Sequence, residues 1–127
     1  MIEQTECPFC EIPRERIIAE NDLAFAVPDG FPVTKGHTLI IPKRHVADYF
    51  DLTSEERAVL ETLAHGCRKE LIDNDTSIDG FNIGANAGVS AGQTVFHVHI
   101  HLIPRRTGDM ENPRGGIRGV IPDKRIY

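Results

Sequence analysis

The sequence has no long apolar run. Its apolar stretches, such as residues 39–41, fall far short of the roughly 20 residues that a membrane-spanning helix needs. The first six residues are acidic and contain neither a basic segment nor an apolar one, so they do not resemble a secretory signal. We therefore expect a cytoplasmic protein that does not enter a membrane.

Proline, glycine and positive charge are not in excess either. Proline and glycine together make up 19 of 127 residues, and 40% of the residues are hydrophobic, which argues against disorder. This length is typical of one domain, spanning residues 1–127. The net charge of −5 argues against a nucleic-acid partner. Residues 104–127 nevertheless form a basic tail of net charge +3, which either attracts a small anion or is simply solvated.

Cysteine is scarce, with three residues in the chain. Cys7 and Cys10 form a Cys-x-x-Cys pair, and in a reducing compartment such a pair indicates metal or redox chemistry before a disulfide. No strand is predicted before Cys7 and no clear helix after Cys10, which disfavours a thioredoxin-like motif. Cys67 lies on the apolar face of a predicted helix and is expected to be an inert core thiol.

The apolar patterns predict an α+β fold, in which an antiparallel sheet carries one long helix on one face. Thr53 and Glu56 form a capping box, and the helical spacing after it predicts a helix over residues 54–73. The predicted strands cover residues 17–20, 23–27, 37–42, 81–85 and 95–103, the last of them stopped by Pro104.

Three histidines alternate with apolar residues in the last predicted strand. Because a strand has a period of two, His97, His99 and His101 should emerge on one face, while the apolar residues between them face the core. Three imidazoles on one face fit either a metal site or catalysis in which a neutral imidazole attacks phosphorus.

The residues before the histidines favour the second chemistry. They combine glycines with amide and hydroxyl side chains, which can hold phosphate oxygens through backbone N–H groups and neutral hydrogen bonds. These residues are Asn86, Gly88, Gly92, Gln93 and Thr94.

Two segments resemble the histidine triad (HIT) family of nucleotide hydrolases and transferases, in its bacterial type with an N-terminal Cys-x-x-Cys zinc motif. Residues 86–105 match the family's signature of three alternating histidines, and residues 29–45 match a second block. The resemblance covers about residues 7–105. It implies a HIT-like fold, a small nucleotide as substrate, and a homodimer formed through the long helix and the sheet edge near residues 81–85.

The resemblance also implies roles for single residues. His99 would be the nucleophile that forms a nucleotidyl-histidine intermediate, and the His97 carbonyl would accept a hydrogen bond from its ring. His101 and Gln93 would contact phosphate oxygens or the leaving group. The other nucleotide-binding positions would be Asp29, at the ribose hydroxyls, His37, Asn86, Gly92 and Thr94. Phe9 and Ile12 would line the base pocket or belong to the core.

The implied substrates are conjugates of AMP or GMP that are cleaved at the α-phosphate without obligatory magnesium. Nucleoside phosphoramidates and dinucleoside polyphosphates are examples. Gly30 follows Asp29 where relatives often carry an aliphatic residue against the base, so the base preference stays open. The tail lacks the tryptophan of the small phosphoramidase branch, so the leaving group stays open too.

In relatives with the cysteine pair, a zinc ion is bound by both cysteines, by the histidine after the Ile-Pro-Lys strand and by the first triad histidine. In this sequence those residues are Cys7, Cys10, His45 and His97. Four such ligands close a tetrahedral site, which is typical of structural zinc.

Two further functions fit the same residues. In one, His97, His99 and His101 bind a single catalytic metal ion. In the other, the chain is a nucleotide-binding regulatory protein with little turnover.

Overall fold

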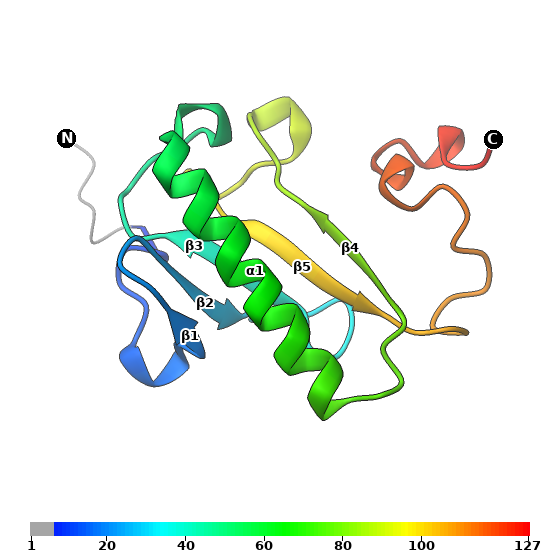
Figure 1. Cartoon of the computed structure of the whole chain (residues 1–127). Helices are drawn as coiled ribbons and strands as arrows, with labels where there is room; N and C mark the ends of the chain where they lie inside the picture. Colours follow the sequence, from blue (N-terminus) through cyan, green and yellow to red (C-terminus); the bar gives the residue numbers. More distant parts are fainter. Residues whose placement is uncertain (1–6) are drawn as a thin grey trace.

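A computed structural model describes residues 7–127 of the chain. The fold of these residues is built on one antiparallel sheet. Within these residues five strands lie in the order β1-β2-β3-β5-β4, and α1 (Ser54–Asn74) lies across one face of the sheet (Figure 1). The strands are β1 (Ala19–Glu20), β2 (Ala24–Pro28), β3 (Thr38–Pro42), β4 (Gly80–Gly84) and β5 (Ile100–Arg105). Short 3-10 turns are η2 (Arg14–Arg16), η3 (Tyr49–Asp51), η4 (Val89–Ala91), η5 (Gly116–Val120) and η6 (Pro122–Lys124). The predicted α+β architecture is confirmed.

The predicted capping box starts α1. The Thr53 hydroxyl accepts a hydrogen bond from the Glu56 amide at 3.0 Å, and the Glu56 carboxylate accepts one from the Thr53 amide at 2.9 Å. Arg44 also donates two hydrogen bonds to Glu56, at 2.8 and 2.9 Å. The start of α1 is therefore bonded to the loop after β3, which carries His45.

The two faces of the sheet have different cores. On one face, Ala24, Ala26, Ile40 and Leu102 pack with the buried side of α1. On the other face, four buried residues pack with three residues of the N-terminal segment. The four are Phe25, Val27, Leu39 and Ile41, and the three are Phe9, Ile12 and Ile17. The face without the helix is thus covered in part by residues 9–17.

The bounds predicted for the last strand, residues 95–103, were wrong at both ends. The observed strand β5 begins five residues later, at Ile100, and ends two residues later, at Arg105. Residues 95–97 form a bend and residues 98–99 are not paired with β3. The Val98 amide instead donates to the Val46 carbonyl, in the loop after β3, at 2.8 Å. Pro104 does not stop β5. It pairs with Phe81 of β4, and its carbonyl accepts a hydrogen bond from Thr34 at 2.7 Å.

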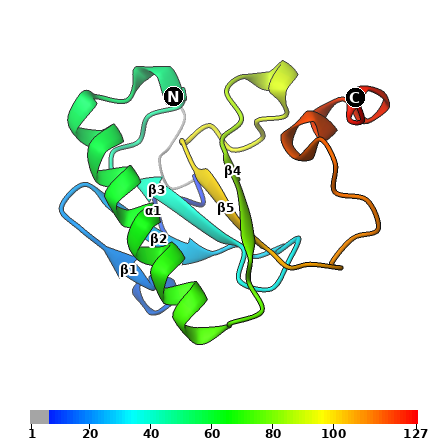
Figure 2. The ribbon, with the colours of Figure 1, turned by 45° about the vertical axis from the view of Figure 1, so that its right-hand side comes forward.

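The C-terminal tail leaves the end of β5 and lies on the β4 side of the sheet, away from β1 (Figure 2). Its first arginines are paired rather than free. Arg105 donates to Asp109 and Asn82, and Arg106 donates to Asp75, to Ser77 and to the Lys35 carbonyl. No helix in residues 7–127 combines the length and the apolar character needed to cross a membrane.

Candidate active site and metal cluster

The histidines of the last strand lie on the sheet face opposite α1. His101 is paired with Leu39 of β3, and opposed residues of an antiparallel pair point to the same side. Leu39 belongs to the core of the face without the helix, whereas Val98 and Leu102 pack against the helix. The predicted alternation is therefore present, although His97 and His99 precede the strand itself.

His99 is held by the backbone two residues earlier. Its Nδ1 atom lies 2.9 Å from the carbonyl oxygen of His97. A carbonyl oxygen only accepts, so Nδ1 carries the hydrogen, and the Nε2 atom of the neutral ring keeps its lone pair. This is the arrangement that a nucleophilic imidazole needs.

His101 is oriented by a second histidine. The Val33 amide donates to His37 Nδ1 at 3.1 Å, so the hydrogen of the neutral His37 ring is on Nε2. That Nε2 lies 2.9 Å from His101 Nδ1, which must then accept. As a result, the neutral His101 ring carries its own hydrogen on Nε2 and can donate there.

Burial favours the neutral form of both of these rings. Desolvation lowers the pKa of His37, although the nearby Asp29 carboxylate opposes this change. Desolvation also lowers the pKa of His101, with further lowering from His99 and His37. Asp29 Oδ2 lies 3.3 Å from His37 Nε2, and Asp29 Oδ1 accepts from the Phe31 amide at 2.7 Å. His37 and His101 are therefore hydrogen-bonded to each other beside His99, and the Asp29 carboxylate lies close to both.

The loop before the histidines is shaped by Gln93 and by glycine. Gln93 is buried, and its amide oxygen accepts from the Gly88 amide at 2.8 Å. Its amide nitrogen donates to the Ala47 carbonyl at 2.7 Å and to the Val95 carbonyl at 3.1 Å. Gly88 has φ +100°, a conformation that side chains with a Cβ rarely adopt. In this arrangement Gln93 links the loop to the segment after β3.

The remaining predicted nucleotide contacts lie on this same loop. Asn86 is half-buried, Thr94 is exposed, and Gly92 has φ +92°. Within residues 7–127, no hydrogen bond joins the side chain of Asn86 or Thr94 to the histidines. The structure thus brings Asp29, His37, His99 and His101 together, and it places Asn86, Gly92 and Thr94 on the adjoining loop.

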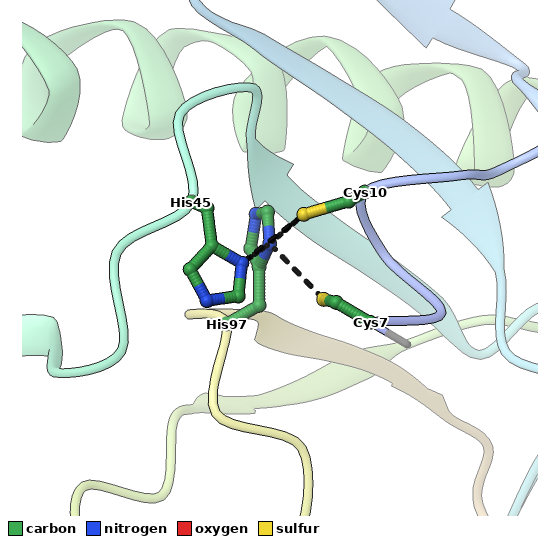
Figure 3. A group of neighbouring side chains, drawn as sticks. All are labelled: Cys7, Cys10, His45 and His97. Atoms are coloured by element: carbon green, nitrogen blue, oxygen red, sulfur yellow. Dashed lines mark hydrogen bonds between the residues drawn. The ribbon is translucent and has the colours of Figure 1, made fainter. Parts of the chain in front are cut away.

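Cys7, Cys10, His45 and His97 form a compact cluster, with their ligand atoms within 4.8 Å of one another (Figure 3). The two histidine Nδ1 atoms are 3.2 Å apart, and the sulfur–nitrogen distances are 3.1 to 3.5 Å. A zinc ion with ordinary bond lengths gives tetrahedral edges of about 3.3 Å between nitrogens and about 3.6 Å between nitrogen and sulfur. The four side chains therefore fit a tetrahedral zinc ion.

The protonation of the cluster also fits a metal. His97 is fully buried, and its Nε2 lies 2.8 Å from the Pro42 carbonyl, so Nε2 donates and Nδ1 presents a lone pair to the cysteines. Burial lowers the pKa of His97, which favours the neutral ring that binds metal. Burial and the adjacent Cys7 raise the pKa of Cys10 to about 11. A bound cation would stabilise its thiolate instead.

Two other metal arrangements do not fit. Asp29, His37 and His101 lie close enough to share an ion, but His37 already accepts at Nδ1 and therefore carries a hydrogen on the Nε2 atom that would have to bind. Within residues 7–127, His97, His99 and His101 do not form a group of three whose ligand atoms all lie within 4.8 Å of one another. The single catalytic metal ion considered from the sequence is contradicted by this geometry.

Phe9, which the sequence analysis placed at the base pocket or in the core, packs against the imidazoles of the site. Its ring centroid lies 4.9 Å from that of His99 and 6.1 Å from that of His97. The available signal was its position inside the Cys-x-x-Cys pair, which places its backbone near the cluster. The Val33 amide and the Pro42 carbonyl were missed as well, since backbone partners leave no trace in residue types.

Comparison with known proteins points to one family. A profile of the HIT domain matches residues 11–108. The adenylylsulfatase HINT3 of Arabidopsis thaliana is 38% identical over 114 residues, covering 84% of this chain and 55% of the relative. The AP-4-A phosphorylase of Mycobacterium tuberculosis is 36% identical over 108 residues, covering 80% of this chain and 55% of the relative. Each of these relatives is therefore considerably longer than the part that matches.

Solved structures give the same result. A zinc-bound histidine triad family protein from Mycobacterium smegmatis superimposes with a TM-score of 0.77 at 35% identity, covering 87% of this chain and 82% of that structure. The strands and the helix thus belong to a known arrangement.

Proposed function

Because this chain belongs to the HIT domain family, we propose that it is a nucleotide-binding hydrolase that releases AMP or GMP from conjugates at the α-phosphate. The observation that carries the proposal is the hydrogen bond from His99 Nδ1 to the His97 carbonyl, which leaves Nε2 free as a nucleophile. The names of relatives add one substrate class to test, adenylyl sulfate, and give a second reason to test dinucleoside polyphosphates.

The reaction would proceed in two steps. In the first, the lone pair of His99 Nε2 forms a bond to the α-phosphorus while the bond to the leaving group breaks, and that electron pair departs with the leaving group. In the second, water attacks phosphorus and gives a proton to the solvent, while the P–N bond breaks, its electron pair returns to His99 Nε2 and the nucleoside monophosphate is released. A polyphosphate or sulfate leaves as an anion, whereas an amine must take up a proton as it leaves.

The neighbouring residues would position the substrate and balance its charge. His101, which carries a hydrogen on Nε2, would donate to a phosphate or leaving-group oxygen. Asp29 would accept from the ribose hydroxyls, since its carboxylate keeps lone pairs beyond the contacts to Phe31 and His37. Asn86, Gly92 and Thr94 would approach the phosphate from the loop. Gln93 would act through the loop that it braces, and Phe9 and Ile12 would border the base.

The cysteine–histidine cluster would hold a structural zinc ion. When bound, the ion would supply fixed geometry and stabilise the thiolates of Cys7 and Cys10, since four protein ligands leave it no open position. The displacement at phosphorus then depends on this chain's own imidazoles and N–H groups, and we expect it to need no added magnesium.

A homodimer is supported by the uncovered side of α1 and β4. An open, mainly apolar groove of about 850 Å³ lies between them, lined among others by Leu60, Ala64, Phe81 and Ile100. Because β4 is an edge strand, its outer backbone groups are available to a second copy. Light scattering at micromolar concentration should give the mass of two chains, and a stable monomer would remove this part of the proposal.

The test is a substrate comparison between the wild-type protein and His99→Ala. Adenosine and guanosine phosphoramidates, dinucleoside polyphosphates and adenylyl sulfate are offered, and release of the nucleoside monophosphate is measured. We expect turnover of at least one class, and a loss of about 1,000-fold or more in His99→Ala with nucleotide affinity changed only a few-fold. Full activity of the variant would refute the proposal. Tight nucleotide binding without turnover by the wild type would favour the regulatory alternative.

A further inference from the structure

We propose that the metal cluster does more than secure the N-terminal segment: it sets the orientation of the His99 ring, with Phe9 as the positioning residue. The ring of His99 has two contacts with the residues that form or adjoin the cluster. One is a hydrogen bond to the backbone of a ligand, and the other is the Phe9 side chain, which sits between two ligands in the sequence. The kinetic consequence rests on the proposed function, whereas the structural claim does not.

The first contact fixes one edge of the ring. His97 supplies Nδ1 to the cluster, and its carbonyl oxygen lies 2.9 Å from His99 Nδ1. His97 is also anchored on its other side, where Nε2 meets the Pro42 carbonyl at 2.8 Å. Fixing the His97 side chain in the cluster therefore also fixes the His97 carbonyl group, which orients the ring of His99.

The second contact restricts rotation of the ring. The Cys7–Cys10 segment is a tight turn, in which the Cys10 amide donates to the Cys7 carbonyl at 3.1 Å. This turn projects Phe9 onto the site, and its ring packs edge-on against His99 at a centroid distance of 4.9 Å and an interplanar angle of 66°. A hydrogen bond at Nδ1 alone allows the ring to pivot about that contact, and the packed Phe9 ring restricts this movement on one side.

A metal ion is what makes this arrangement rigid. Without one, the turn is joined to His45 and His97 by thiol–imidazole contacts of 3.1 to 3.5 Å, and sulfur forms weak hydrogen bonds. Four metal bonds would connect residues 7, 10, 45 and 97 into one unit. Because misplacement of a reacting atom by about 1 Å can cost about 100-fold in rate, a small movement of Phe9 would matter at His99.

The experiment follows the His99 ring directly by NMR, without substrate. Ring carbon and nitrogen resonances are recorded for the zinc-loaded protein, for the same protein after chelation, and for Cys10→Ser and Phe9→Leu. His99→Asn assigns the signals. Cys67→Ala is the matched cysteine control, because Cys67 is buried in the helix-side core and outside the cluster.

We expect the zinc-loaded wild type to show one set of His99 signals with the hydrogen on Nδ1. Chelation or Cys10→Ser should shift and broaden these signals while the circular dichroism spectrum stays folded. Phe9→Leu should keep one zinc per chain yet lose the ring-current shift at His99, and kcat should fall about tenfold with the same zinc content. Cys67→Ala should leave zinc content and the His99 signals unchanged.

Unchanged His99 signals in Phe9→Leu would overturn the proposal, as would unchanged signals in a folded, zinc-free protein. If removal of zinc unfolds the chain, the His99 signals of Phe9→Leu alone test the proposal, because this variant retains the metal. Since these readouts need no turnover, the inference can fail while the hydrolase stands, and it can hold if the chain only binds nucleotides.

Discussion

The Nε2 atom of His37 lies 2.9 Å from the Nδ1 atom of His101, and the Val33 amide fixes which of the two carries the hydrogen. This contact turns His101 into a donor on the side that faces away from His37. A residue just before β3 thereby determines what a residue of β5 can offer to a substrate.

Replacement of His37 should affect the chemical step more than binding. In His37→Phe the hydrogen bond to His101 is lost, so both tautomers of His101 become populated, and we expect kcat to fall about tenfold or more with a smaller change in KM. Steady-state kinetics on the best substrate checks this result. His65→Gln is the matched control, since His65 is exposed on α1. Equal losses in both variants would contradict the role of His37.

Loss of one cysteine ligand should remove the metal and lower stability. Purified wild-type protein should contain one zinc per chain, whereas Cys7→Ser should contain little and should unfold at least about 5 °C lower. Elemental analysis and thermal denaturation measure the two quantities. Cys67→Ala should keep its zinc, and retention of zinc by a double Cys7→Ser, Cys10→Ser variant would show that the metal lies elsewhere.

The salt bridge at the start of α1 should give a defined acid dependence. Hydrogen bonds from Arg44 and Thr53 lower the pKa of Glu56 to about 2, whereas an unfolded glutamate titrates near about 4.3. A lowered native pKa contributes stability that is present above the unfolded value and is lost as the pH falls through the native value. The difference in Tm between wild type and Glu56→Gln should be constant above about pH 5 and should shrink between about pH 4.3 and 2.

Glu55→Gln provides the control for that series, because Glu55 is exposed one residue earlier in the same turn. Its Tm should follow the wild type at every pH. A Glu56→Gln difference that persists unchanged at pH 2.5 would mean that the ionised carboxylate is not the stabilising group.

Gln93→Glu separates two roles for this residue. The variant is nearly isosteric, but the Gln93 amide now donates hydrogen bonds to the Ala47 and Val95 carbonyls. A carboxylate at this position could not donate to these two acceptors. We expect a lower Tm together with a higher KM, as the loop loses its shape. A large loss of nucleotide affinity at unchanged Tm would instead indicate that Gln93 contacts phosphate directly.

The sequence alone predicted the elements whose signals are local. The capping box of Thr53 and Glu56 marked the start of α1, and the alternation around His99 placed the imidazoles on the face away from the helix. The beginning of β5 was wrong, because the choice of partner for residues 95–99 depends on the loop after β3. The prediction that Pro104 ends the strand was wrong for a related reason. Its carbonyl accepts a hydrogen bond from Thr34, and its missing N–H matters less at that position.

The part of the site that depends on side-chain chemistry could be predicted from the sequence. The four residues of the metal cluster do lie together, and so do Asp29, His37 and His101. Hydrogen positions on the rings could not be predicted, because they depend on the backbone groups of Val33, Pro42 and His97 that only the fold brings near. The bracing role of Gln93 was hidden likewise, since its partners at Ala47 and Gly88 are main-chain atoms.

The most direct test of the account is rapid-quench isolation of the enzyme during turnover of a substrate labelled in its α-phosphate. We predict one acid-labile nucleotidyl group per chain, attached to His99 and formed and consumed at rates no slower than kcat. Label on another residue, or steady turnover with no covalent adduct at any time, would contradict it.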